Sequence, residues 1–135
     1  MNYFAEAGNL LIANEHGQIS WTGRPGGYPV QWASPTPDTE EVLVLYAYQP
    51  PVQKQHGFQN LVRLDSNLNV IWRADLPVSD DVYVRAGFSK AGIEADSFEG
   101  YRVIVDINTG KIVDQKWTKY EAQGGNRLVT PSATA

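Results

Sequence analysis

The sequence contains no cysteine, and its basic residues are few and scattered. Without cysteine, disulfides and thiolate chemistry are excluded, and a structural zinc site would need other ligands. The 11 Lys and Arg residues stand singly among 15 acidic residues, which gives a net charge of −4. Binding to nucleic acid or to a membrane surface depends on concentrated positive charge, so we expect neither.

Long hydrophobic runs are also absent. No segment approaches the ~20 apolar residues that a membrane-spanning helix needs. The stretch MNYFAEAGNLLIA has no basic n-region, and its apolar run is too short for a signal peptide. Together with the lack of cysteine, these features lead us to expect a cytoplasmic protein.

Helix signals are scarce, whereas strand signals occur throughout the chain. The best helical candidate, residues 1–7, is short. Runs of Val, Ile, Leu, Tyr and Trp alternate with Gly, Pro, Asn and Asp, which is typical of strands and turns. The predicted strands are residues 9–13, 18–22, 29–33, 41–48, 59–64, 69–74, 82–87, 92–96, 101–106 and 111–117. Residues 41–48 are apolar on both alternating faces, so we expect this strand to be central.

These runs predict one all-β domain over residues 1–122, an antiparallel meander of about ten strands. The remaining residues, 123–135, are expected to be a mobile tail or to add an edge strand. Within them the string NRLVT, residues 126–130, has the composition to pair with an edge of the same chain or of another.

One short string occurs three times. NEHGQISW at residues 14–21 is echoed by DSNLNVIW at 65–72, and more loosely by residues 106–113. Each echo predicts a β-hairpin in which an Asn or Asp side chain caps the turn and a glycine takes positive φ. In the second unit Leu68 and Asn69 replace the glycine, and we expect Asn69 to take the left-handed conformation.

Two further strands precede the second hairpin, and two precede the third. The chain is therefore predicted to hold two four-stranded meanders of roughly 45 residues each, preceded by a lone hairpin. Four strands per 40–50 residues is the period of β-propeller blades.

The strings at residues 14–21 and 65–72 resemble the ends of blades in β-propellers of the quinoprotein type. In that family an acid-x-x-Gly-x-(Val/Ile)-x-Trp string closes each blade, and the tryptophan docks onto the neighbouring blade. The resemblance implies this role for Trp21 and Trp72. In the third unit Asp114 stands where the tryptophan would be, and Trp117 follows three residues later. Members of the family often bind a quinone or act as scaffolds, but no position here matches their cofactor residues, so we expect no cofactor.

About two and a half blades cannot close a propeller alone, because closed rings hold about four to eight. Three arrangements remain open. The repeats can form a barrel or a two-sheet sandwich, two chains can close a five-bladed ring, or an exposed edge can be covered by another partner.

The chain has no strong catalytic or metal-binding motif. It lacks a phosphate-binding glycine loop before a helix, a G-x-S-x-G elbow and a D-x-D-x-D-G calcium loop. His16 and His56 are predicted in a turn and a polar loop without a nearby acid cluster. Metal ligation is therefore not expected.

The aromatic residues are the best candidates for a binding site. Aromatic side chains are enriched at protein interfaces, and we single out four of them as ligand or partner contacts: Tyr28, Trp32, Tyr46 and Tyr48. We therefore expect a non-catalytic binding domain that acts through protein contacts, including self-association as a homodimer.

Two alternatives come from other functional classes. A carbohydrate-binding module would use Trp32, Tyr28 and acids from the loops. A small hydrolase would use Asp80, Asp81 and Glu94 as paired carboxylates.

Overall fold

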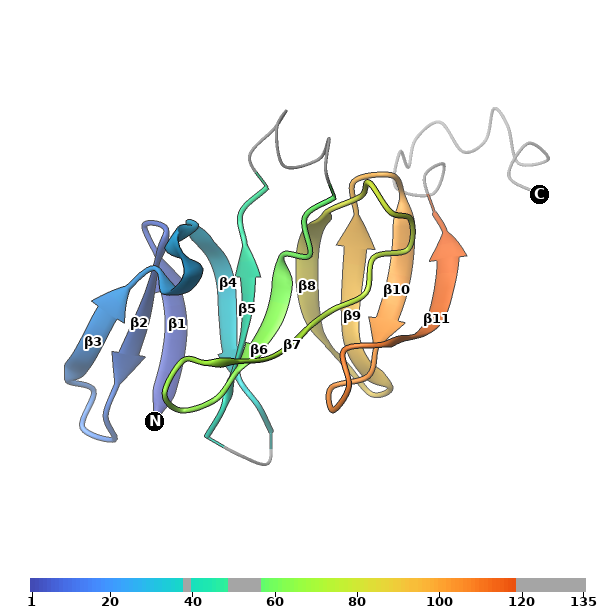
Figure 1. Ribbon diagram of the computed structural model, residues 1–135. Coiled ribbons are helices and arrows are strands. Elements are labelled where there is room, and N and C mark those ends of the chain that lie inside the picture. Colours follow the sequence, from blue (N-terminus) through green and yellow to red (C-terminus); the bar gives the residue numbers. More distant parts are fainter. Residues whose placement is uncertain (38–39, 49–56, 119–135) are drawn as a thin grey trace, which may run out of the picture.

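The computed structural model describes residues 1–37, 40–48 and 57–118 (Figure 1). This part of the chain contains eleven strands and one 3-10 turn, η1 (Pro25–Gly27). The strands are β1 (Asn2–Glu6), β2 (Asn9–Ala13), β3 (Ile19–Gly23), β4 (Val30–Pro35), β5 (Val42–Tyr46), β6 (Leu61–Leu64), β7 (Val70–Arg73), β8 (Tyr83–Ser89), β9 (Gly92–Ser97), β10 (Tyr101–Val105) and β11 (Ile112–Trp117). The predicted all-β antiparallel class is confirmed.

The strands form three antiparallel sheets that follow one another along the chain (Figure 1). Sheet I holds β1, β2 and β3, sheet II holds β4 to β7, and sheet III holds β8 to β11. Sheets II and III are the two predicted four-stranded meanders. The described strands form no closed barrel.

The predicted lone hairpin is instead a three-stranded sheet, because residues 2–6 form strand β1 and not a helix. Tyr3 pairs with Ile12 and Ala5 with Leu10, so β1 places alternate side chains against the core. Ala7 and Gly8 have φ values of 53° and 80° and make the tight turn into β2. This turn and the burial of Tyr3 override the weak helical preference.

The three echoing strings form the same turn, as predicted. In each, the side-chain Oδ1 of the leading residue accepts the backbone N–H two positions on, at 2.7–2.9 Å; the leading residues are Asn14, Asp65 and Asp106. The first two also accept the N–H four positions on, at 3.0 and 2.9 Å. Such local bonds fix the chain reversal before any contact between sheets is made.

The prediction for the second turn was wrong in one residue. Leu68, not Asn69, takes positive φ, at 66°, where the other turns have Gly17 at 80° and Gly110 at 77°. The reason is that Asn69 is bonded to Asp65 through both its N–H and its C=O. These two bonds make Asn69 the start of the returning strand, so the reversal takes place at Leu68. The left-handed conformation costs a non-glycine residue about 1–2 kcal/mol. Leu68 offsets this cost by packing against the core between sheets I and II.

Sheet II lies between the other two sheets and is buried on both faces. Every residue of β5 is buried, which confirms the central position predicted for this strand. One face packs against Tyr3, Leu10 and Ile12 of sheet I through Val42, Val44, Tyr46, Val62 and Leu64. The other face packs against Tyr83, Ile93, Ala95, Val103 and Val105 of sheet III through Leu43, Leu45, Leu61 and Trp72.

Trp72 connects sheet II to sheet III. Its indole N–H donates to the carbonyl of Ile107 at 3.0 Å, and Arg63 Nη1 donates to the same carbonyl at 2.8 Å. The ring lies on Gly110, where a Cβ would be 2.7 Å from the indole. Arg63 is itself held by Glu41, with Nη2 2.6 Å from Oε1. The third turn is thus fixed to sheet II by packing and by two hydrogen bonds.

Trp21 stands at the equivalent place in sheet I but does not dock in the same way. It is 38% exposed, against 8% for Trp72. At the position of Gly110, the second turn carries Leu68, whose side chain packs against the core between sheets I and II. The ring of Trp21 lies instead against Gly23 of its own strand, where a Cβ would be 2.8 Å away. The expectation that both tryptophans are packed alike is therefore wrong for Trp21.

A buried amide provides a second link between sheets II and III. Asn60 is fully buried, and its Nδ2 donates to the carbonyls of Tyr46 and Tyr83 at 2.8 and 2.7 Å. Its Oδ1 accepts the N–H of Tyr83 at 2.9 Å. The start of β8 is therefore bonded to the central sheet, and the buried amide has partners for both N–H donors and for its carbonyl oxygen.

The outer face of sheet III is polar. In sheet II, the side chains that pair across neighbouring strands and face sheet III are Leu43, Arg63 and Trp72. The equivalent side chains of sheet III, which lie on its outer face, are Glu94, Ile104 and Asp114. Beside it, Asp96 accepts hydrogen bonds from Arg85 and Arg102. Burial alone would raise the pKa of Asp96, but these bonds outweigh it and lower the pKa. No docking tryptophan is present on this face.

Substitution of the turn glycines tests the docking of Trp72. Gly17 and Gly110 both have positive φ, but a Cβ at Gly17 would meet nothing within 4 Å. Gly17→Ala should therefore cost only the left-handed penalty, about 1–2 kcal/mol of unfolding free energy. Gly110→Ala should cost about 1–3 kcal/mol more, because the methyl group overpacks the indole. Urea denaturation measures both, and equal losses would contradict the docking.

The two tryptophans should also differ in their contribution to stability. Trp72→Ala should lower the unfolding free energy by about 3–5 kcal/mol, as is usual for a buried tryptophan. Trp21→Ala should cost less, since more than a third of its surface already faces solvent. Chemical denaturation of the two variants measures this, and a loss under about 1 kcal/mol for Trp72→Ala would show that its ring is not buried.

Candidate functional site

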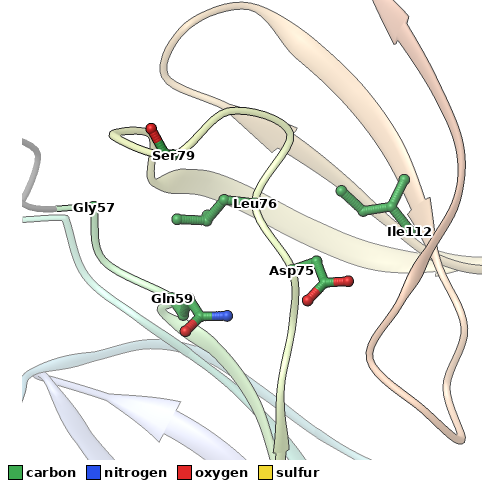
Figure 2. A pocket seen from close by; sticks show the side chains of 6 residues that line it. All are labelled: Gly57, Gln59, Asp75, Leu76, Ser79 and Ile112. Atoms are coloured by element: carbon green, nitrogen blue, oxygen red, sulfur yellow. The ribbon is translucent and has the colours of Figure 1, made fainter.

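Two hollows occupy equivalent places between successive sheets. Each lies beside the connection that leads from the last strand of one sheet to the first strand of the next. The hollow between sheets II and III has a volume of about 450 Å³ and is lined by Gly57, Gln59, Asp75, Leu76, Ser79 and Ile112 (Figure 2). The hollow between sheets I and II is smaller, at about 140 Å³.

The larger hollow is a shallow depression without convergent polar groups. The amide of Gln59 is already used, since its Nε2 donates to the carbonyl of Ala74 at 3.1 Å. Asp75 and Ser79 are exposed, and Figure 2 shows Ser79 well apart from both Asp75 and Gln59. The described side chains around this hollow thus offer no nucleophile with an adjacent base.

The smaller hollow, which we call the aromatic pocket, is lined mainly by apolar and aromatic groups. Its described lining is Pro25, Gly26, Tyr28, Tyr46, Phe58, Gln59, Val62, Leu64, Leu68, Val70 and Arg73. The connection from β3 to β4, which contains η1, forms one wall, and sheet II forms the floor. Most of the lining comes from elements whose positions are fixed by the core between sheets I and II.

Three rings form one side of the aromatic pocket. The centroid of Tyr28 lies 4.7 Å from that of Phe58 and 5.5 Å from that of Tyr46, and Tyr46 and Phe58 are 6.3 Å apart. Tyr46 is 6% exposed, whereas Tyr28 is 40% exposed. A Cβ at Gly26, which has φ +78°, would lie 2.9 Å from the Tyr46 hydroxyl. Glycine at this position therefore allows the η1 turn to lie close to the ring.

The other side of the aromatic pocket comes from β7, the edge strand of sheet II. Val70 pairs with Leu64 and Arg73 with Val62, so both point to the face that carries the core shared with sheet I. Val70 is 43% exposed. Arg73 is exposed as well, and it forms no ion pair or hydrogen bond with any other residue that the structure describes. The guanidinium in the pocket lining thus has no partner among the residues that the structure describes.

The hydroxyl of Tyr46 is a proton donor available inside the aromatic pocket. Burial raises the pKa of this phenol, the positive charge of Arg73 lowers it in part, and Tyr28 raises it. The net shift is upward, so the hydroxyl remains protonated at neutral pH. It has no hydrogen-bond partner among the described residues. Together with Arg73 it can bind an acceptor oxygen.

The structure brings together two of the four predicted site residues. Tyr28 and Tyr46 line the aromatic pocket, but Trp32 packs against the core on the opposite face of sheet II, with its ring 6.0 Å from that of Phe88. Tyr48 also lies elsewhere and contacts Phe98, with ring centroids 5.2 Å apart. The four aromatics therefore do not form one surface.

Sequence reasoning missed Phe58 and Arg73. Phe58 stands next to a polar loop, and nothing in its neighbourhood signals a ring that packs on Tyr28. Arg73 follows Trp72 on a short edge strand, where a charged side chain is ordinary. Only the pairing of Arg73 with Val62 shows that it faces the same side as the pocket floor.

The acids of the hydrolase alternative are not adjacent. Asp81 is fully buried, and its Oδ1 accepts the backbone N–H groups of Val82 and Glu99 at 2.8 and 3.1 Å. Glu94 pairs with Gly87, which lies four residues after Tyr83 on β8, roughly 13 Å along an extended strand. Paired carboxylates for glycoside cleavage are about 5–10 Å apart. Asp80 is exposed in the loop before β8.

Among residues 1–37, 40–48 and 57–118, no three His, Asp or Glu side chains are placed to hold a metal ion together. No helix found there has the length and apolar character to cross a bilayer. His16 is largely exposed beside Glu15, and His56 lies outside the described residues, as does the string at residues 126–130.

The described residues define an all-β protein of three consecutive antiparallel sheets, with the aromatic pocket between the first two. The chain belongs to the family described as "Domain of unknown function (DUF7957)", which matches residues 37–117. This span runs from within the β4–β5 connection to the last residue of β11. It includes Tyr46, Phe58 and Arg73 of the pocket and leaves out Tyr28. A comparison with curated proteins gives no match.

The upward pKa shift of Tyr46 predicts a loss of stability in alkali. Ionisation is harder in the folded state than in the unfolded state, where tyrosine has a pKa of about 10. The stabilisation is therefore complete below about pH 10 and is lost as the pH rises through the folded-state value. Urea midpoints measured through this range should fall less steeply for Tyr46→Phe than for the unmodified protein. Identical slopes would show that Tyr46 is not shielded from solvent.

Proposed function

We propose that the protein is a non-catalytic binding domain that recognises another protein by enclosing one of its side chains in the aromatic pocket. The observation that carries this proposal is the position of the pocket, which lies directly beside the open edge of β7. No described strand pairs with the outer side of β7. An extended partner segment can therefore pair with this edge and direct one side chain into the pocket.

The size of the pocket supports a single side chain as the guest. Pockets for drug-sized ligands are usually about 300–1,000 Å³. A volume of about 140 Å³ corresponds to a few water molecules, each of which takes up about 30 Å³ in the liquid. A leucine or phenylalanine side chain is of this order, so the volume favours an inserted anchor over a larger free ligand.

The composition of the surface supports the same proposal. Tyrosine and arginine are over-represented among residues that dominate binding energy at interfaces, and both are present at the pocket mouth as Tyr28 and Arg73. Val70 and Ile71 extend the apolar surface along the edge strand, with exposed fractions of 43% and 45%. This binding needs no cofactor, and we place it in the cytoplasm, as expected from the sequence.

A second copy of the chain is the other candidate partner. Sheet I has no counterpart of β4 and β8, the first strands of sheets II and III. A strand from a second copy would complete it, and this would also be the way in which two chains close a propeller-like ring. Self-association of this kind predicts a solution mass of twice that of the chain by light scattering at micromolar concentration.

The other two classes have less support. Trp32 and Tyr28 lie on opposite faces of sheet II, so a sugar cannot stack on both. The acids of the hydrolase alternative are separated along the chain and in space, as described above.

Selection from a phage-displayed library of random linear peptides tests the proposed function. Peptides with an aliphatic or aromatic anchor should be enriched, and Tyr28→Ser should weaken their binding by tenfold or more, the effect of losing about 1.4 kcal/mol or more. Phe88→Ser is the matched control, because Phe88 is 45% exposed but lies away from the pocket. Peptides that bind Tyr28→Ser as tightly as the unmodified protein would overturn the proposal.

A further inference from the structure

The charge distribution around the aromatic pocket differs from that of the whole chain. The sequence has an excess of acidic residues and a net charge of −4, but Arg73 is the one charged group among the described residues that line the pocket. Arg24, which precedes η1, adds a second positive charge nearby, although its Nε is bonded to Asn9 Oδ1 at 3.1 Å. The pocket is therefore a positive site on a negative protein.

Two donors at this site have no described acceptor. The guanidinium of Arg73 offers five N–H donors in a planar fork, which matches a carboxylate in two parallel hydrogen bonds. The hydroxyl of Tyr46 adds a further donor, and Tyr46 and Arg73 line the same pocket. Leu64, Leu68 and Val70 add apolar surface to the lining of the same pocket.

We infer that the aromatic pocket selects a partner segment in which an apolar anchor is followed closely by a carboxylate, and that Arg73 and Tyr46 bind this carboxylate. The inference rests on the proposed function and specifies the chemistry of its partner. The occupant is an extended acidic segment of another protein. The apolar side chain fills the space beside Tyr28 and Phe58, and the carboxylate lies over the end of β7, where Arg73 is the last residue of the strand.

Strand pairing explains why the two features are required close together. Side chains two residues apart on an extended segment point to the same face and are about 7 Å apart. Val70 and Arg73 are both on the pocket side of β7, one near each end of this short strand. A segment paired with β7 can therefore place an anchor beside Val70 and an acid beside Arg73 at the same time.

The test begins with the same peptide selection, carried out on the unmodified protein and on Arg73→Gln. The unmodified protein should enrich Asp or Glu within two positions of the anchor, and Arg73→Gln should not. The most enriched peptide is then synthesised in its acidic form and with each acid replaced by its amide, Glu→Gln or Asp→Asn. Fluorescence anisotropy should show at least tenfold weaker binding for the amide form, and stronger salt dependence for the acidic form.

Protein variants assign the effect to the two donors. Arg73→Gln should weaken the acidic peptide at least tenfold and leave the amide peptide within about twofold. Arg73→Lys should recover part of the loss, since it keeps the charge but not the fork. Tyr46→Phe should reduce the preference for acid over amide. Arg85→Gln is the control, because Arg85 lies on the outer face of sheet III and is paired with Asp96.

The outcomes separate this inference from the proposed function. Selection of neutral peptides that still require Tyr28 would overturn the carboxylate preference and leave the binding domain in place. Equal affinities of the acid and amide peptides would do the same. Failure to select any peptide that depends on Tyr28 would overturn both.

Discussion

The indole of Trp72 seated on Gly110 is the contact on which the arrangement of sheets II and III depends. A tryptophan from one sheet reaches across to the hairpin turn of the next, and a glycine there leaves room for the ring. The Ile107 carbonyl in the same turn accepts from both Trp72 and Arg63. Packing and hydrogen bonding thus act at one point, and Asn60 holds the start of β8 a short distance away.

The interface between sheets I and II shows what happens when this contact is not made. Leu68 replaces the glycine, its side chain packs inward, and Trp21 remains partly in solvent. The same region of sheet II is then left with an accessible hollow, lined by Leu68, Val70 and Arg73 on one side and by three rings on the other. Glycine or leucine at the positive-φ position of the repeated turn therefore accompanies two different interfaces, one with a docked indole and one with the aromatic pocket.

Local patterns predicted much of the fold, because the turns are determined by residues close in sequence. The three strings gave the hairpins and the two four-stranded sheets, and the two-sided apolar character of β5 gave its central place. The left-handed conformation of Leu68 was not predicted, because a contact with a distant sheet offsets its cost. Two residues of the pocket, Tyr28 and Tyr46, were predicted from the sequence as binding aromatics. Their contact with Phe58 and Arg73 depends on how three segments pack together, and no local sequence pattern predicts that packing.

The outer face of sheet III is polar, so the two ends of the stack of three sheets are not equivalent. Between sheets II and III a tryptophan of one sheet docks on a glycine turn of the next, and the row Glu94, Ile104 and Asp114 on the outer face of sheet III provides no such tryptophan. Gly17 in the first turn, in contrast, has open space above it. A sheet placed ahead of sheet I could therefore set a tryptophan on the first turn, whereas a sheet placed behind sheet III would face Glu94 and Asp114.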